Sequence, residues 1–211
     1  MPSVPRRTLL RLAAPSGTIA LAGCLDNILP EDSTPTVGPG TQRRVVLHDQ
    51  DTVSDRHQVR IEAIVAVPTV TESHTATVRT TLTNEGPERA IGVSTGACSL
   101  FNRRDAVSEP QGLWLDYDLE NGEPTGNAWV QDGLPEGQSG FGGYGCPKET
   151  YGKGDSLQNE YTLWGDGRAD GYMRPGTYRW ETEVQLWSDA DTDGAPTSEF
   201  VWGFSLTVTE Q

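Results

Sequence analysis

Three aspartates at alternate positions are the residues of this chain best placed to bind a metal ion. Asp189, Asp191 and Asp193 precede a glycine in the stretch DADTDGAPTSEF. Alternate carboxylates followed by a glycine open calcium-binding loops, which a glutamate at the twelfth position closes. Here Phe200 holds that position and Glu199 falls one residue short. We therefore favour an acidic hairpin loop without a cofactor, and calcium is the weaker alternative.

Two cysteines in the second half of the chain could form a disulfide. Cys98 and Cys146 stand 48 residues apart (146 − 98). An even pair in an oxidising compartment favours a disulfide, and closing a loop of this length contributes about 4 kcal/mol in the chain-entropy model. A two-thiolate metal site would need His or Cys neighbours at ligand spacing, and neither cysteine has them. We predict the Cys98–Cys146 disulfide.

The third cysteine, Cys24, follows a segment with the order of an export signal. Arg6, Arg7 and Arg11 come first, a short apolar stretch follows, and no acidic residue precedes Asp26. Basic, apolar and small residues in this order are typical of a signal peptide. The apolar stretch is too short, and too rich in Pro, Ser, Gly and Thr, to span about 30 Å of hydrocarbon as a helix.

The paired arginines resemble a twin-arginine (Tat) signal, and Leu21–Cys24, read as LAGC, resembles the lipobox of lipoproteins. In that family the cysteine thiol receives a lipid and the mature chain begins there. Because one acyl chain gives only marginal membrane binding, durable attachment implies two chains on Cys24. The resemblance implies a protein anchored in the cell membrane and facing outside. The alternative is a plain signal peptide with an incidental cysteine.

Composition divides the chain into three parts and sets its charge. Residues 1–23 are the signal, residues 24–42 a tether rich in Pro and Gly, and residues 43–211 one domain. Three of the 16 Lys+Arg residues leave with the signal, so 13 remain against 30 Asp+Glu and the mature balance is −17. So acidic a surface excludes nucleic acid as a partner. The lysine-poor composition is similar to that of haloarchaeal proteins; the alternative is an acidic protein from an ordinary organism.

Alternation of apolar and polar residues predicts strands along most of the domain. In residues 176–187, Tyr178, Trp180, Val184 and Leu186 alternate with polar side chains. Such period-two patterns indicate strands with one wet face, and Gly/Pro turns between them favour an antiparallel β-sandwich. The other predicted strands are 43–49, 57–67, 75–84, 89–95 and 200–208. Residues 97–160 lack this alternation and are expected to form a long irregular insertion.

Residues 163–186 carry a resemblance to two groups of Ig-like domains. The Trp–Asp/Gly turn followed by Pro-Gly-Thr-Tyr is similar to that of the flagellar hook-capping Ig-like domain and of the bacterial intracellular proteinase inhibitor family. The strand end Leu82–Gly86, L-T-N-E-G, is similar to the second group as well. Pro175 and Gly176 set a tight turn, and we expect the Tyr178 ring to be buried with its hydroxyl bonding the backbone. The resemblance implies an Ig-like sandwich.

The aromatic residues of the insertion could form a binding surface or a small core beneath the loops. Loops on a rigid sandwich often carry binding surfaces, and exposed rings stack on sugars or side chains. We favour a core pinned by the disulfide. The residues concerned are Trp114, Tyr117, Trp129, Phe141, Tyr144 and Tyr151.

We expect a cell-surface, lipid-anchored protein whose domain binds or scaffolds an unknown protein or carbohydrate. The resemblance implies proteinase inhibition as one alternative, and an uncharacterised enzyme is the other. Catalysis is disfavoured because His48, His57 and His74 show no ligand spacing and GQSGF is not a nucleophile elbow. No catalytic residue is predicted.

The charge predicts salt-dependent stability. The mature chain has a net charge of −17, and repulsion among its carboxylates raises the energy of the compact state in dilute buffer. The Debye length is about 30 Å at 0.01 M salt and falls to about 3 Å at 1 M, so molar salt screens this repulsion. We expect the Tm of the domain to rise steeply as NaCl or KCl is raised into the molar range. Calorimetry in chloride salts measures this, and a Tm that stays flat from about 0.1 to 3 M would contradict it.

Overall fold

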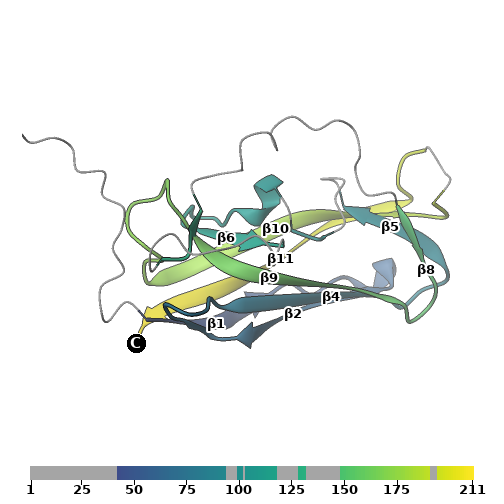
Figure 1. The fold of residues 1–211 in the computed structure, drawn as a ribbon. Coiled ribbons are helices and arrows are strands. Elements are labelled where there is room, and N and C mark those ends of the chain that lie inside the picture. The colour runs from purple at the N-terminus through teal and green to yellow at the C-terminus, as the bar shows by residue number, and fades with distance from the viewer. Residues whose placement is uncertain (1–41, 94–98, 102, 118–127, 132–147, 191–193) are drawn as a thin grey trace, which may run out of the picture. The chain divides into compact units, whose positions relative to one another are not determined.

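The described residues form two antiparallel sheets that pack against each other (Figure 1). The computed structural model describes residues 42–93, 99–101, 103–117, 128–131, 148–190 and 194–211. Its strands confirm the predicted all-β antiparallel sandwich. Two short 3₁₀ turns, η1 (Asp55–His57) and η2 (Arg103–Ala106), interrupt them. Among the residues described, no helix has the length and apolar character that crossing a bilayer requires.

The larger sheet has six strands in the order β3-β1-β11-β10-β5-β8. Neighbouring strands run antiparallel throughout this sheet. The strand bounds are β3 (Thr69–Val70), β1 (Arg43–Gln50), β11 (Ser198–Glu210), β10 (Gly176–Trp187), β5 (Arg89–Val93) and β8 (Glu149–Tyr151).

The smaller sheet has the order β2-β4-β9-β6, with the short strand β7 parallel to the end of β9. Among the described residues, β2 and β6 are the outer strands of this order, and Val107 forms an isolated bridge with Trp114 on the outer edge of β6. The strand bounds are β2 (Val59–Val67), β4 (Thr77–Asn84), β9 (Ser156–Asp166), β6 (Leu113–Asp116) and β7 (Val130–Gln131).

The β10–β11 hairpin is the longest continuous pairing and supplies the centre of the core. It runs from Gly176 opposite Val208 to Leu186 opposite Ser198. Its inward side chains are buried, and the rings of Trp180 and Phe204 stack at 5.4 Å with an interplanar angle of 18°. Offset stacking of this kind adds about 0.5–1.5 kcal/mol beyond area burial. The inward faces predicted for these two strands are confirmed.

The inward face predicted for residues 57–67 is right at one end of β2 and wrong at the other. Val59, Ile61 and Ala63 are buried, whereas Val67 is 36% exposed. The register against β4 shifts between Val65 and Val67. A bulge inserts an extra residue and turns the side chains that follow away from their expected face.

The region 97–160 contains strands that its sequence pattern did not predict. β6, β7 and β8 lie inside it, and β9 begins there. Trp114 of β6 and Trp164 of β9 are opposite each other, and both rings are buried although they share a face with polar residues of β9. A strand buried on both faces shows no alternation, so periodicity cannot reveal it.

The two ends of the sandwich carry different parts of the chain. At one end, called here the proximal end, Arg43 pairs with Glu210 and the segment 167–175 joins β9 to β10. At the opposite, distal end lie the loop 51–58 between β1 and β2, the start of β5, the end of β10 and the start of β11 (Figure 1). The first described residues, which follow the predicted tether, therefore enter the domain at the proximal end.

Arg43 is fixed where the tether enters the domain. Its side chain is buried, and Nε donates a 2.9 Å hydrogen bond to the carbonyl of Met173. The guanidinium also reaches the carbonyl of Tyr172 at 3.4 Å and a carboxylate oxygen of Glu210 at 3.5 Å. The first residue of β1 is thus bound to the 167–175 segment and to the last strand.

The Pro-Gly-Thr-Tyr turn has the expected geometry. The Tyr178 ring is buried, and its hydroxyl donates a 2.8 Å hydrogen bond to the carbonyl of Arg174. Just before this turn, the buried carboxylate of Asp166 accepts hydrogen bonds from the backbone and guanidinium of Arg168 and from the amide of Gln111. These contacts hold the connection from β9 to β10.

Replacing Asp166 tests this turn. Burial alone would raise the pKa of its carboxyl, but the hydrogen bonds from Arg168 and Gln111 outweigh burial and lower it from 3.8 to about 2. The ionised form therefore stabilises the fold above pH about 4, and that stability is lost as the pH falls toward 2. We expect Asp166→Ala to lower the free energy of unfolding by about 2–3 kcal/mol at pH 7.

Chemical denaturation at pH 7 and at low pH measures this effect. Asp170→Ala is the matched control, since Asp170 lies exposed in the same segment. Equal stability of the two variants at pH 7 would contradict the assigned role of Asp166.

Candidate functional site

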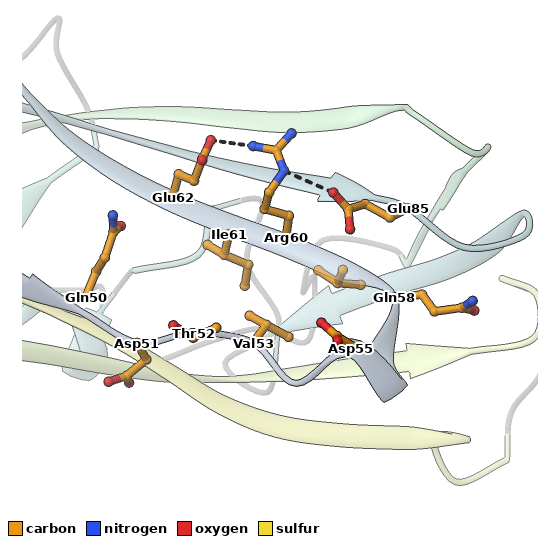
Figure 2. A pocket seen from close by; sticks show the side chains of 11 residues that line it. Gln50, Asp51, Thr52, Val53, Asp55, Gln58, Arg60, Ile61, Glu62 and Glu85 are labelled. Carbon is orange, nitrogen blue, oxygen red and sulfur yellow. Dashed lines mark hydrogen bonds and ion pairs between the residues drawn. The ribbon is translucent and has the colours of Figure 1, made fainter.

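A recess at the distal end is a concave feature of the described surface (Figure 2). It has a volume of about 310 Å³ and lies between β2 and the loop that connects β1 to β2. This volume is at the lower end of the range for small-ligand sites. The lining residues are Gln50, Asp51, Thr52, Val53, Asp55, Gln58, Val59, Arg60, Ile61, Glu62 and Glu85.

The charges around this distal recess are mostly negative. Four carboxylates line it against the one guanidinium of Arg60. That guanidinium donates to Glu85 at 3.0 Å and to Glu62, and these bonds raise the pKa of Arg60 (Figure 2). Asp55 is exposed on the opposite side of the recess. The arrangement favours a cation or a positively charged side chain over an anion.

Asp51, the fourth carboxylate, holds the fold together. One carboxylate oxygen accepts bonds from Arg179 at 2.6 Å and from the amide of Gly203 at 2.9 Å. The carbonyl of Asp51 accepts a 2.9 Å bond from the indole of Trp202. Asp51 therefore ties the end of β1 to β10 and β11, which leaves Asp55, Glu62 and Glu85 as the lining carboxylates outside this network.

The backbone of β2 lines the recess with unpaired groups. The amide of Glu85 donates to the carbonyl of Gln58, which makes these opposite residues a hydrogen-bonded pair. Antiparallel pairs alternate between bonded and non-bonded, so the amides and carbonyls of Val59, Ile61 and Ala63 point away from β4. Asn84, opposite Val59, bonds in the other direction, to residues 154 and 155, as this alternation requires.

The side chain of Gln50 covers one of these edge groups. Its amide oxygen accepts a 2.7 Å hydrogen bond from the backbone amide of Ala63. Gln50 therefore occupies the place that a neighbouring strand would take. Within the described part of the chain, no such partner bonds the edge-facing backbone of Val59 or Ile61.

A histidine–serine pair lies nearby, under the turn η1. His57 is buried, and its Nδ1 lies 2.7 Å from Oγ of Ser198. Arg56 Nε donates a 3.0 Å hydrogen bond to the other ring nitrogen, Nε2. Because Nε2 accepts, the neutral ring carries its proton on Nδ1 and donates to Ser198. A general base must accept the serine proton, so this tautomer cannot activate Ser198.

The aromatic residues of the 97–160 region lie mainly in the core. Trp114 and Tyr151 are buried, and Trp129 packs edge-on against Trp164 at 5.2 Å. Tyr117 is 48% exposed. The interpretation as core thus holds for these rings except Tyr117, whereas Phe141 and Tyr144 lie outside the described residues.

The structure describes few of the residues named from sequence as candidate sites. Cys24, Cys98, Cys146, Asp191 and Asp193 all lie outside the described residues. Asp189 is described: it is exposed, and its carboxylate accepts a 3.0 Å hydrogen bond from Ser188. In the ranges that the structure covers, no three His, Cys, Asp or Glu residues are grouped so that they could hold a metal ion.

Sequence analysis did not point to the distal recess. Its lining residues come from three separate segments, 50–55, 58–62 and residue 85, and no motif joins them. The only signal was that the predicted strands 43–49 and 57–67 follow each other along the chain, so a short loop must connect them.

The tautomer of His57 predicts a specific pH dependence. Burial first, and then the charge of Arg56, lower its pKa below 6.5. The neutral ring therefore stabilises the fold above pH about 6.5, and this stability is lost as the pH falls below that value. We expect ¹⁵N NMR to detect the Nδ1–H form, and His57→Gln to remove this part of the pH dependence of unfolding. A ring protonated at Nε2 at pH 7 would contradict the assignment and make Ser198 a candidate nucleophile.

Comparison with known proteins adds no relative: no protein-family model matches the chain, and no match was found among curated proteins or solved structures.

Proposed function

We propose that this protein is a lipid-anchored, extracytoplasmic binding or scaffolding protein. The observation that carries the proposal is the order of its parts: an Arg-Arg export signal, LAGC, a Pro- and Gly-rich tether, and then a β-sandwich that begins at Arg43. Lipid on Cys24 would hold the chain at the outer face of the cell membrane. The acidic, lysine-poor composition supports a high-salt environment.

The junction between tether and domain supports a tethered role. Arg43 is bonded to Met173 and lies within ion-pair distance of Glu210. Its backbone lies between β3 and β11, because Arg43 pairs with Val70 on one side and Glu210 on the other. Because Arg43 is held on both sides, a force on the tether would act on the larger sheet and not on a loosely held chain end.

The position of the distal recess also supports a binding role. β1 leads from the tether at Arg43 to Gln50, which lines the recess. Seven intervals of about 3.3 Å separate Arg43 from Gln50 by roughly 23 Å. A partner bound at the distal end would therefore be held away from the tether attachment.

Proteinase inhibition is less well supported, because the residues that carry that resemblance hold the fold together. Tyr178 bonds the carbonyl of Arg174. Asn84, the N of the L-T-N-E-G segment, is buried, and its amide nitrogen donates to the carbonyls of Pro87, Tyr151 and Gly152. Both segments thus have structural reasons for their sequence, and the resemblance supports a fold rather than an activity.

Replacement of Cys24 tests the anchor. We expect Cys24→Ser to release the protein from the membrane fraction, because the variant lacks the thiol that would receive the lipid. Fractionation of expressing cells at native salt, followed by immunoblotting, measures this. The lipoprotein signal LAGC is unchanged in Cys98→Ser, which serves as the control. A Cys24→Ser protein that remains wholly with membranes would contradict the proposal.

A further inference from the structure

The outer edge of β2 at the distal recess has the properties of a site for strand addition. Val59 and Ile61 direct their backbone amides and carbonyls away from β4, while their side chains are buried in the core. Edge groups of this kind pair readily with an extended chain. In strand addition, these main-chain hydrogen bonds supply affinity and neighbouring side chains supply specificity.

Other parts of the same edge are protected against such pairing. Gln50 bonds the amide of Ala63, and the register shift between Val65 and Val67 distorts the end of the strand. A side-chain amide bonded to an edge group, like a bulge in the strand, prevents another strand from pairing there. Among the described residues of this edge, Val59 and Ile61 have no backbone partner on the side of the recess, which adjoins them with a volume of about 310 Å³.

The charge beside this segment selects the partner. Asp55, Glu62 and Glu85 are among the lining residues, and Arg60, which bonds Glu62 and Glu85, is the one cation among them. Figure 2 shows Glu62 and Glu85 beside β2 on the side away from Asp55, and Asp51 is engaged by Arg179. A second copy of this chain, with its mature balance of −17, would be repelled here. A segment that carries lysine or arginine would be attracted, and it could replace the exposed contacts that Arg60 makes.

We propose that the edge of β2 at the distal recess binds an extended, positively charged peptide segment of a partner protein, which adds as a strand beside Val59 and Ile61. This inference deepens the proposed binding function and rests on it. The partner's backbone pairs with β2, and its basic side chains lie near Asp55, Glu62 and Glu85. A partner strand longer than the recess would displace the Gln50 amide from Ala63.

Binding of synthetic peptides to the signal-free chain tests the proposal. The probe is an end-capped octapeptide that alternates valine and lysine. One control peptide has glutamate in place of lysine, and the other keeps the lysines but is methylated on every backbone nitrogen. Calorimetry at about 0.1 M and 2 M NaCl gives Kd, and amide hydrogen exchange by NMR reports on Val59 and Ile61.

We expect the methylated peptide to bind at least about tenfold more weakly than the probe, because it has lost its main-chain donors. Exchange of the Ile61 amide should slow by about tenfold or more in the presence of saturating probe. The double variant Asp55→Asn/Glu62→Gln should weaken binding about fivefold at low salt. The matched control, Glu183→Gln/Glu199→Gln, removes two carboxylates that do not line the recess and should leave Kd unchanged.

Three results would overturn the inference. Equal binding of the methylated peptide would indicate surface charge attraction alone. Absence of binding by the lysine probe at both salt concentrations would exclude the site. Dimerisation of the chain with protection of Ile61, detected by light scattering and exchange, would assign the edge to a second copy. None of these results concerns membrane attachment, so a failure here is distinguishable from a failure of the Cys24→Ser experiment.

Discussion

The pairing of β10 with β11 is the interaction on which the rest of the domain depends. Their eleven-residue register brings Trp180 and Phe204 into a stack and places Trp202 beside them in the core. The other strands of the larger sheet extend from this hairpin, since β1 joins β11 and β5 joins β10. The smaller sheet then covers the inward aromatic face. Loss of this hairpin would leave neither sheet with a partner.

Much of this fold could be predicted from sequence, because a strand with one solvent-exposed face shows a clear alternation of apolar and polar residues. The alternation in residues 176–187 identified both the strand and its buried side, and the Pro-Gly-Thr-Tyr turn predicted the buried ring of Tyr178 and its bond to the backbone. β6 and all of β9 were missed, and for β6 and the end of β9 the reason is the opposite one. The guanidinium of Arg168 lies 5.1 Å from the ring centre of Trp114, so this outer-face indole is covered and its strand has no wet side.

The candidate site was far less predictable, because it consists of backbone direction rather than residue type. Whether the amide of Ile61 points toward β4 or toward the recess depends on which opposite pairs are hydrogen-bonded, and this is set by the register against β4. Side-chain alternation is the same in either case. Asp55 and Glu85 line the same recess only because the end of β1, the start of β2 and the end of β4 lie close together.

The fixation of Arg43 has a mechanical consequence for a domain held by its N-terminus. Tension between the tether and a partner at the distal end would act along the axis of β1. The hydrogen bonds that join β1 to β11 lie across that axis, so they are loaded together in shear rather than broken one at a time. Forced unfolding depends on the height of the unfolding barrier rather than on equilibrium stability. If the domain is anchored as proposed, the hydrogen bonds between β1 and β11 would therefore resist a pulling force to a degree that the melting temperature alone would not reveal.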